Sequence, residues 1–373
     1  LKNNLKDVKN AKNRKIKSNL IQRLYLNSDK IDQIIKSIKL ISKLKDPENI
    51  ILRKWSQPNG LVIKKITIPI GVIGIIYESR PNVTSDVSCL CFKSGNCVIL
   101  KGGSESYNTN KIIVNLFKKS LKKNKLSENY IQYIENKNRK VVDFMLSKMK
   151  PYIDVIIPRG GKNLVKKVQQ KSTIPIIGHL EGVCHTYVDK KANINMARKV
   201  ILNAKLRNTG ICGSTETILF HQNISNKSLN IILNSLVKNG CEIFADKKTR
   251  KIFKGRSRIA SEKDWSTEYL APKVSVRIVK NLQEAINHIN KYGTMHTDAI
   301  ITQDKNCANY FMRSIKSSIA IHNASTQFAD GGEFGFGGEV GISTNNLPPR
   351  GPVGLNELVS YKYEVSGKGQ IRD

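Results

Sequence analysis

The sequence predicts an α/β protein built from two doubly wound domains. Short apolar runs that suit buried strands alternate with stretches of helical periodicity, and this alternation occurs once on each side of about residues 190–210. The length of 373 residues also exceeds one ordinary hydrophobic core. Buried strands interleaved with helices favour parallel sheets with right-handed crossovers.

The first half of the chain begins with helices. Isoleucine recurs at helical spacing from Asp29 to Leu44, which predicts an amphipathic helix with Ser28 as a possible N-cap. The pattern then predicts strands at 60–69, 70–77, 96–101, 154–158, 174–178 and 183–189, with helices at 83–93, 108–123 and 162–170.

The second half repeats the alternation. A helix at 194–204 leads into a glycine-flanked cysteine, and strands and helices follow in turn. We expect strands at 215–220, 274–279, 298–302 and 318–322, with helices at 225–238 and 282–291.

The chain is strongly basic, with 63 Lys and Arg against 29 Asp and Glu, a formal net charge of +34. Such a balance invites a nucleic-acid-binding interpretation. However, the lysines are scattered over nearly every predicted helix, and no recognisable reader motif occurs. We therefore expect no nucleic-acid partner. We also expect no membrane span, because no stretch approaches about 18 consecutive apolar residues.

The seven cysteines are irregularly spaced, and no CxxC pair occurs. An odd, irregular set favours reduced thiols in a cytoplasmic protein over a disulfide framework or a zinc site, so we expect no metal. The chain begins with Leu1 rather than Met and shows no charged-then-apolar leader, and we expect that residues of the natural N-terminus precede it.

Glycines cluster in "KGGSES", "PRGGKN" and "ADGGEFGFGGEVG". Each of the first two follows a predicted strand and precedes a predicted helix, where phosphates bind at helix N-termini. Neither matches a nucleotide-binding fingerprint, so plain turns remain an equal interpretation.

Cys212 lies in "NTGICGSTETILF", between Gly210 and Gly213 and near Arg207. A catalytic thiol needs exposure and a positive potential, whereas Cys89, Cys91 and Cys97 lie in apolar patterns typical of inert buried thiols. Cys184, in a strand beside His185, is a weaker candidate because neighbouring strand residues face opposite sides. From spacing alone, Cys212 is either a nucleophile or a small hydrophobic residue. His296 and His322 flank predicted strands, and we expect structural hydrogen bonds from them.

Several long segments resemble the gamma-glutamyl phosphate reductases, also called glutamate-5-semialdehyde dehydrogenases, a family of the aldehyde dehydrogenase superfamily. The match runs in order from about Gly71 to Tyr363. Its segments include "GVIGIIYESRPNVTSDVSCLCFKSGNCVILKGGSES", "PRGGKNLV", "GHLEGVCHTYVD", "NTGICGSTETILFHQNI", "HTDAIIT" and "NASTQFADGGEFGFGGEVGIST". The resemblance implies an aldehyde dehydrogenase-like fold with a small β oligomerisation element.

The same resemblance implies NADPH-dependent reduction of glutamyl 5-phosphate to glutamate 5-semialdehyde in proline biosynthesis, with glutamate 5-kinase as the pathway neighbour. Cys212 would form a thioester with the small-molecule substrate. The backbone N–H of Cys212 and the side chain of Asn82 would hold the oxyanion, with Arg80 as a competitor of Asn82.

For the cofactor NADP, the resemblance implies that Lys101 contacts the adenosine ribose. Ser104 stands where NAD users commonly carry a carboxylate, which would suit a 2′-phosphate, although Glu105 is adjacent. Arg159, Gly160 and Gly161 resemble the loop under the pyrophosphate. Glu268, in "TEYLAPKV", resembles the glutamate that binds the nicotinamide ribose.

One segment departs from aldehyde-oxidising relatives. Where these carry a water-activating glutamate in an ELGGK-like motif, this chain reads "HLEGV". His179 takes the place of the glutamate, which suits an enzyme that must keep water from its thioester. The alternative is that Glu181 serves the same role after a shift of register.

The resemblance also implies a division into residues 1–200 as the cofactor-binding domain, 201–343 as the catalytic domain and 344–373 as a C-terminal return. Strands near 52–68 and the tail "LVSYKYEV" would mediate a homo-oligomer. Three alternatives stay open: a reductase of another acyl phosphate such as aspartyl phosphate, a basic nucleic-acid-binding protein, and an inactive remnant that assembles with a partner.

Overall fold

The computed structural model describes residues 1–16 and 18–372, and it divides into two compact α/β units. Unit 1 comprises Leu1–Gly178, Gly335–Gly341 and Pro352–Asp373, and unit 2 comprises His179–Phe334 and Ile342–Gly351. The two units carry one four-stranded and one seven-stranded sheet respectively, so the predicted class of two α/β domains is confirmed.

Unit 1 is centred on a parallel sheet of order β5-β4-β3-β6. Its strands are β3 (Val72–Tyr77), β4 (Cys97–Gly102), β5 (Ile131–Tyr133) and β6 (Val155–Arg159). Their aliphatic side chains are almost fully buried on both faces, which explains why the strands read as continuous apolar runs.

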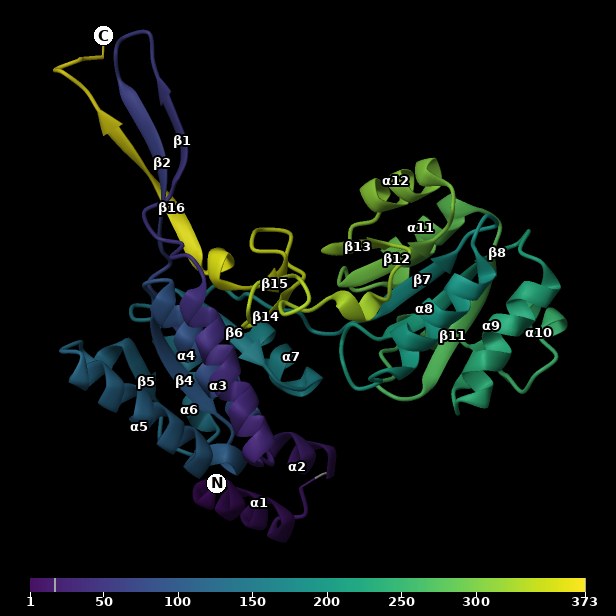
Figure 1. Cartoon of the computed structure of the whole chain (residues 1–373), viewed down its shortest axis with the longest axis horizontal. Helices are drawn as coiled ribbons and strands as arrows, with labels where there is room; N and C mark the ends of the chain where they lie inside the picture. The colour runs from purple at the N-terminus through teal and green to yellow at the C-terminus, as the bar shows by residue number, and fades with distance from the viewer. Residues whose placement is uncertain (17, 373) are drawn as a thin grey trace. The chain divides into compact units, whose positions relative to one another are not determined.

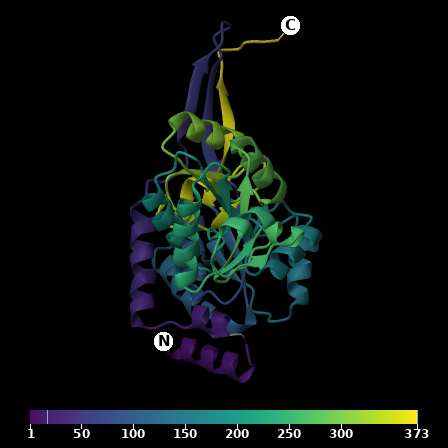
Figure 2. The ribbon, with the colours of Figure 1, turned by 90° about the vertical axis from the view of Figure 1, so that its right-hand side faces the viewer.

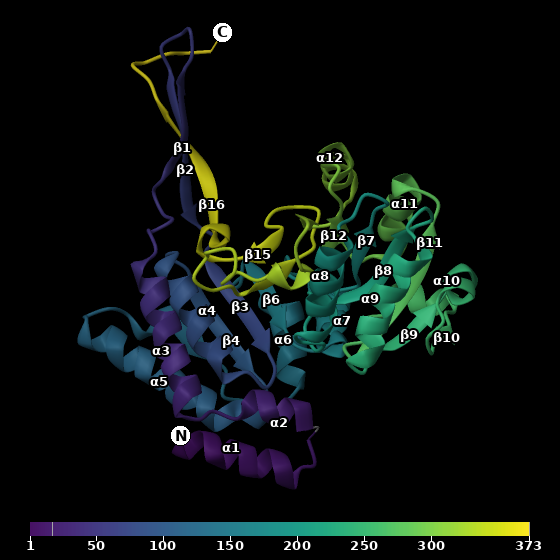
Figure 3. The same cartoon turned by 45° about the vertical axis from the view of Figure 1, so that its right-hand side comes forward.

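Helices cover this sheet. They are α1 (Lys2–Asn13), α2 (Ser18–Leu24), α3 (Ser28–Lys43), α4 (Pro81–Lys93), α5 (Tyr107–Lys123), α6 (Lys140–Lys148) and α7 (Lys162–Lys171). Helix α3 packs on α4, and Figure 3 shows both helices near strand β4. The N-cap of α3 is Asn27, whose side chain accepts from the backbone N of Lys30, and not Ser28 as the sequence suggested.

A three-stranded antiparallel sheet extends from unit 1 as a narrow arm, which Figure 1 shows in full length. It consists of β1 (Ile51–Ser56), β2 (Val62–Pro69) and β16 (Val359–Ser366), with β2 in the centre. Figure 2 shows the arm from the side, with helix α1 at the opposite end of the unit.

Unit 2 contains a parallel sheet of order β10-β9-β11-β8-β7-β12-β13. The strands are β7 (Cys184–Val188), β8 (Thr215–His221), β9 (Glu242–Ala245), β10 (Arg258–Ile259), β11 (Lys273–Val279), β12 (Thr297–Ile301) and β13 (Ile319–His322). The helices are α8 (Ile194–Leu206), α9 (Asn226–Lys238), α10 (Lys247–Ile252), α11 (Leu282–Tyr292) and α12 (Lys305–Ser314). Two short strands, β14 (Gly341–Ser343) and β15 (Gly351–Val353), form a separate pair.

Two expectations from the sequence are corrected. Residues 174–178 form no strand, and only Ile176 makes an isolated bridge to Ile156, because Pro175 has no N–H to donate to a ladder. The chain passes between units after Gly178 rather than near residue 200, because β7 pairs with β8 and β12 in the sheet of unit 2.

Within the described part of the chain, none of the helices combines the length and the apolar character that a membrane crossing requires.

Candidate active site around Cys212

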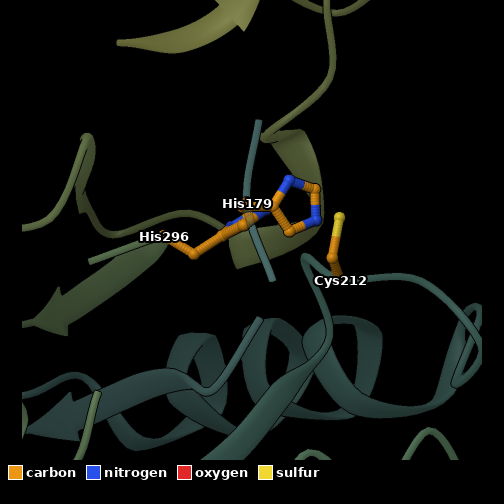
Figure 4. A group of neighbouring side chains, drawn as sticks. All are labelled: His179, Cys212 and His296. Carbon is orange, nitrogen blue, oxygen red and sulfur yellow. The ribbon is translucent and has the colours of Figure 1, made fainter. Parts of the chain in front are cut away.

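Cys212 lies in the loop between helix α8 and strand β8 of unit 2. Its Sγ and one ring nitrogen from each of His179 and His296 lie within 4.8 Å of one another. The two imidazole rings meet edge to face, with centroids 4.8 Å apart and an angle of 79° between their planes. Figure 4 shows the sulfur turned towards the rings, so three segments that are distant in sequence form one cluster.

The two histidines are held from their Nδ1 sides. Nδ1 of His179 lies 2.8 Å from the carbonyl oxygen of Ile342, and because a carbonyl only accepts, Nδ1 carries the proton. His296 is fully buried directly before β12, and its Nδ1 lies 2.9 Å from Oγ1 of Thr297. Nε2 of His296 is buried and has no hydrogen-bond partner among the described residues.

The electrostatic surroundings favour a thiolate at Cys212. Burial by itself raises the pKa of this thiol, but the positive charge of His296, followed by the hydrogen bond and the charge of His179, outweighs burial and holds the pKa well below its ordinary value. A thiolate is the nucleophilic form of cysteine. Cys212 therefore has the properties of a reactive thiol.

The backbone of Cys212 packs closely against the segment that precedes β7. A Cβ atom added to Gly182 would lie only 2.0 Å from the carbonyl oxygen of Cys212, so only glycine fits there. The Gly182 amide donates to Oε1 of Glu268 at 2.8 Å, and the thiol of Cys184 donates to the Cys212 carbonyl at 3.1 Å. Cys184 is thus a buried support of the loop, and burial raises its pKa well above the ordinary value.

A buried ion pair connects the two ends of the cysteine loop. Nζ of Lys205, in the last turn of α8, lies 2.5 Å from Oε2 of Glu216, in β8, and both side chains are completely inaccessible to solvent. Burial raises the pKa of Glu216 to about 7 although Lys205 opposes this. Oε1 of Glu216 also accepts from the backbone N of Leu270 at 3.3 Å, two residues from Glu268.

Arg207, which the sequence places near Cys212, is bound by a glutamine side chain. Its Nε donates to Oε1 of Gln327 at 2.9 Å, and Nε2 of Gln327 donates to the carbonyl of Ala204 at 2.9 Å. Arg207 thus fixes the end of helix α8, while imidazoles surround the sulfur.

The predicted cofactor residues, apart from Glu268, and Asn82 lie in unit 1. Lys101 lies near the carboxyl end of β4, Ser104 begins the short 3₁₀ helix η1 (Ser104–Ser106), and Arg159 ends β6. Asn82 lies in the first turn of α4, directly after β3, and its Nδ2 donates to Oδ2 of Asp86 at 3.3 Å. The structure thus gathers these residues at the carboxyl edge of the parallel sheet, where open α/β sheets bind ligands.

The neighbours of Lys101 bear on its predicted role. Its side chain is largely buried, Nζ donates to the Gly102 carbonyl at 2.9 Å, and burial lowers its pKa while Glu105 opposes this. Oε1 of Glu105 accepts from the backbone N and the hydroxyl of Ser79, at 2.8 and 2.7 Å. The carboxylate of Glu105 is therefore turned into unit 1 and bound there.

The loop at Arg159 is also engaged. The Gly161 amide donates to Oε2 of Glu78 at 2.8 Å, and Nη2 of Arg159 lies 3.8 Å from Oε1 of Glu339. A Cβ at Gly160 would lie 2.7 Å from the Glu78 carboxylate. The start of helix α7 therefore holds a carboxylate from its own unit, and a phosphate would compete with Glu78 for the Gly161 amide.

Sequence reasoning missed the position of His296, which it treated as structural, and recognised His179 only as a replaced glutamate. Neither residue stands at a regular spacing from Cys212, so no motif could connect them. By contrast, Nε2 of His322 lies 3.0 Å from the Thr302 carbonyl, which confirms the structural role expected for that residue.

Comparisons with known proteins identify the family of the chain. The Aldehyde dehydrogenase family model matches residues 23–241. The gamma-glutamyl phosphate reductase of Brucella suis biovar 1 (strain 1330) is 45% identical over 372 residues, which cover 100% of this chain and 88% of that protein. The gamma-glutamyl phosphate reductase of Rhodospirillum rubrum is 46% identical over 369 residues, which cover 99% and 86%.

Solved structures show the same relationship. The crystal structure of gamma-glutamyl phosphate reductase from Thermotoga maritima has a TM-score of 0.97 at 42% identity and covers 100% of this chain and 90% of its own. A propionaldehyde dehydrogenase from Rhodopseudomonas palustris has a TM-score of 0.66 at 18% identity over 91% and 88%, which supports the fold alone. The expected aldehyde dehydrogenase-like fold is therefore confirmed, and the chain belongs to the aldehyde dehydrogenase family and, within it, to the gamma-glutamyl phosphate reductases, which makes it an oxidoreductase.

Proposed function

We propose that this protein reduces glutamyl 5-phosphate to glutamate 5-semialdehyde and phosphate with NADPH, in proline biosynthesis, and that Cys212 is the nucleophile. The names of the relatives at 45% and 46% identity support the substrate. The single observation that supports the mechanism is the contact of Cys212 with two imidazoles, which lower its pKa. Unit 1 would bind the cofactor and unit 2 would carry out the chemistry.

The chemistry has two halves. The Cys212 thiolate attacks the acyl carbon, the carbon–oxygen bond to phosphate breaks, and phosphate leaves with the electron pair, which gives a thioester. A nicotinamide dinucleotide held by the predicted residues Lys101, Ser104 and Arg159 would supply the hydride for reduction of the thioester carbon. The resulting oxyanion then re-forms its carbonyl and expels the thiolate, which releases the aldehyde.

The tetrahedral species of both halves carry a negative oxygen. We assign its stabilisation to the backbone N–H of Cys212 and to Nδ2 of Asn82. Asn82 is solvent-exposed at the start of α4, and its contact with Asp86 is long at 3.3 Å, so its amide can turn to another acceptor.

The cofactor of this family is a nicotinamide dinucleotide. The carboxyl edge of unit 1 fits one in part: Lys101 would bind the adenosine ribose, and Ser104 would hydrogen-bond a 2′-phosphate without charge repulsion. The Glu105 carboxylate is bound by Ser79, which supports NADP over NAD. Pyrophosphate binding by Arg159, Gly160 and Gly161 requires displacement of Glu78 from the Gly161 amide. Glu268 would bind the nicotinamide ribose.

We assign to His179 the role of holding the thiolate rather than of activating water. A carboxylate in its place would raise the pKa of Cys212 through like charge, whereas the imidazole lowers it. This assignment agrees with an enzyme that passes its thioester to a hydride donor rather than to water.

We further propose that the arm mediates a homo-oligomer. Strands β1 and β16 are the two edges of its sheet, and both carry exposed large apolar side chains, among them Leu52 at 54% and Val365 at 58% exposure. Unprotected apolar edges of this kind are typical of interfaces.

The deciding experiment measures phosphate-dependent reduction of NADP⁺ with glutamate 5-semialdehyde, beside the variant Cys212→Ser. We expect turnover in the parent and a loss of at least about 1,000-fold in the variant, with NADPH binding retained. The matched control is Cys307→Ser, which changes a half-buried thiol of α12 and leaves the rate unchanged.

Two outcomes would contradict the proposal. Retained turnover in Cys212→Ser would move the nucleophile elsewhere. Oxidation of the aldehyde at a comparable rate without phosphate would restore Glu181 as a water-activating base.

A further inference from the structure

The cluster at Cys212 offers three donors of the kinds that Zn²⁺ prefers. Thiolate and imidazole are the common ligands of this cation, at about 2.3 Å for sulfur and about 2.0 Å for nitrogen. In a tetrahedral site with such bonds, neighbouring ligand atoms lie roughly 3.5 Å apart. The donor atoms of His179, Cys212 and His296 already lie within 4.8 Å of one another. Side-chain shifts of about 1 Å would therefore complete the geometry.

The outer contacts of the two histidines are those of metal ligands. A histidine that binds a metal through one nitrogen almost always has its other nitrogen held by a carbonyl, carboxylate or similar group. Nδ1 of His179 donates to the Ile342 carbonyl at 2.8 Å, and Nδ1 of His296 lies 2.9 Å from Oγ1 of Thr297. Because Nδ1 is held in both residues, Nε2 is the ring nitrogen that would bind a cation.

His296 provides the independent observation that points to a ligand. Its side chain is completely buried, and within the described residues its Nε2 has no hydrogen-bond partner. A buried polar atom without a partner destabilises the folded state, and a ligand bound at that atom would remove this cost.

We propose that His179, Cys212 and His296 form a binding site for a soft divalent cation, Zn²⁺ in the first place, and that this cation inhibits the enzyme reversibly. Three protein ligands leave the fourth tetrahedral position to water. Soft thiolate and imidazole donors exclude Mg²⁺ and Ca²⁺, which require oxygen ligands.

Inhibition follows from the bond itself. A cation on Sγ takes the electron pair that the thiolate would give to an acyl carbon, so the metal and the acyl donor exclude each other. Binding of the cation does not depend on the proposed reaction. Inhibition does, because it rests on Cys212 as the nucleophile.

Binding is tested with Co²⁺ as a spectroscopic probe, added to the full chain in a buffer free of phosphate and of metal-binding thiols. We expect one equivalent to produce the visible bands of tetrahedral cobalt together with a thiolate-to-cobalt charge-transfer band, and Zn²⁺ to displace it. Cys212→Ser loses the charge-transfer band, and His296→Asn weakens cobalt binding about 10-fold or more.

Matched variants guard against other sites. Cys307→Ser and His322→Asn remove a thiol and an imidazole outside the cluster and leave the cobalt spectrum unchanged. Near-ultraviolet circular dichroism of each variant without metal confirms that its packing is intact. Absence of the charge-transfer band in the parent, or its persistence in Cys212→Ser, would overturn the proposal.

Inhibition is tested separately with Zn²⁺ in the acyl phosphate assay. We expect Zn²⁺ to abolish turnover, a chelator to restore it, and Mg²⁺ at the same concentration to have no effect. Zn²⁺ also slows alkylation of Cys212 by iodoacetamide. The two proposals fail differently. If Cys212→Ser is inactive but the parent protein shows no charge-transfer band with cobalt, only the metal site is refuted. If the parent shows the full cobalt spectrum but Cys212→Ser is active, only the role of Cys212 as nucleophile is refuted.

Discussion

Two cysteines show how the same residue type becomes inert in one unit and reactive in the other. Cys91, on α4 of unit 1, is completely buried among apolar side chains, and burial raises its pKa. The Cys212 thiol of unit 2 is half-buried, and burial again raises its pKa, yet the charges of His296 and His179 hold that pKa well below its ordinary value. Burial alone therefore makes a thiol inert, whereas burial beside imidazoles amplifies an interaction that favours the anion.

The polar groups of the two regions also differ in how fully they are satisfied. At the carboxyl edge of unit 1, Glu105 binds Ser79 and Glu78 binds the Gly161 amide. In the Cys212 cluster, Nε2 of His296 has no partner within the described residues. The carboxylates at the carboxyl edge of unit 1 are thus bound by groups of their own unit. In the Cys212 cluster of unit 2, by contrast, a buried ring nitrogen lacks a hydrogen bond within the described residues.

The largest effect is expected from removing the imidazole of His296. In His296→Asn the pKa of Cys212 rises, because its first opposing charge is lost, and turnover falls about 100- to 1,000-fold. The direction of the pKa change can be measured by labelling Cys212 with iodoacetamide at different pH values. As the pH is lowered, the thiolate of the variant takes up a proton at a higher pH than that of the parent, so its labelling rate begins to fall at a higher pH.

The control is His322→Asn, because His322 makes a structural contact to Thr302 in the same unit. Its labelling profile should match that of the parent. A labelling profile of His296→Asn that also coincides with that of the parent would mean that His296 does not lower the pKa of Cys212, and the difference between Cys212 and Cys91 would need another cause.

A smaller effect is expected at the carboxyl edge of unit 1. Asn82→Ala should lower turnover about 100-fold, because one of two oxyanion donors is removed, while NADPH binding stays unchanged. Steady-state kinetics and fluorescence titration measure the two quantities. Asn124→Ala, at the end of helix α5, is the matched control. A near-normal rate for Asn82→Ala would assign the oxyanion to Arg80 or to the Cys212 backbone alone.

The sequence predicted most of the fold because buried parallel strands leave a strong local signal. The segments that became β3 and β4 are mostly apolar runs, and those that became β8 and β11 are rich in β-branched and other apolar residues. The short strand β9 (Glu242–Ala245) and the polar helix α12 (Lys305–Ser314) were missed, because their stability comes from neighbours rather than from their own pattern. Residues 174–178 were overpredicted for the same reason, since an apolar run does not reveal whether a partner strand is available.

The site was predictable only where chemistry is local. Cys212 stands out because of its glycine-flanked loop, and Lys101, Ser104 and Arg159 lie at or just after the ends of predicted strands whose carboxyl ends meet at one edge. The convergence of His179, Cys212 and His296 depends on the sheet order, which places β7 between β8 and β12. Sequence patterns do not encode that order, so the imidazoles around the sulfur could not be foreseen.

The next prediction concerns the cofactor preference of unit 1. In Ser104→Glu a carboxylate would face the 2′-phosphate of NADP, and the NADPH-to-NADH ratio of kcat/KM should fall roughly 10-fold through like-charge repulsion. Ser120→Glu, on helix α5, adds the same charge away from the carboxyl edge and serves as control. An unchanged ratio in Ser104→Glu would remove the argument for a 2′-phosphate at this residue.

The smallest effect is expected at a buried imidazole, whose pKa is also set by burial and by neighbouring charges. His288, on helix α11, is 4% exposed, and its Nδ1 accepts from Nη1 of Arg277 at 3.0 Å. Burial, followed by the positive charges of His185 and Arg277, lowers its pKa to about 2. Here burial and its neighbours act in the same direction and keep the ring neutral.

The consequence is a loss of stability in acid. Below its unfolded pKa of about 6.5, His288 takes up a proton in the unfolded state but not in the folded state, so the free energy of unfolding falls as pH decreases. Between pH 6.5 and 5.5 the loss from this group is about 1 kcal/mol. His288→Gln keeps an acceptor for Arg277 but cannot titrate, so its free energy of unfolding should fall about 1 kcal/mol less than that of the parent over this interval.

The measurement can be confined to this region because Trp265 contacts the His288 ring, with centroids 5.5 Å apart. In a Trp55→Phe background, the fluorescence of Trp265 is the only tryptophan signal, since the chain has two tryptophans. Urea unfolding followed by this signal at both pH values gives the free energies. If the free energy of unfolding falls equally in His288→Gln and in its background, the buried imidazole is protonated in the folded state. Burial and neighbouring charges, which account for the different pKa values of Cys91 and Cys212, would then not determine the pKa of this histidine.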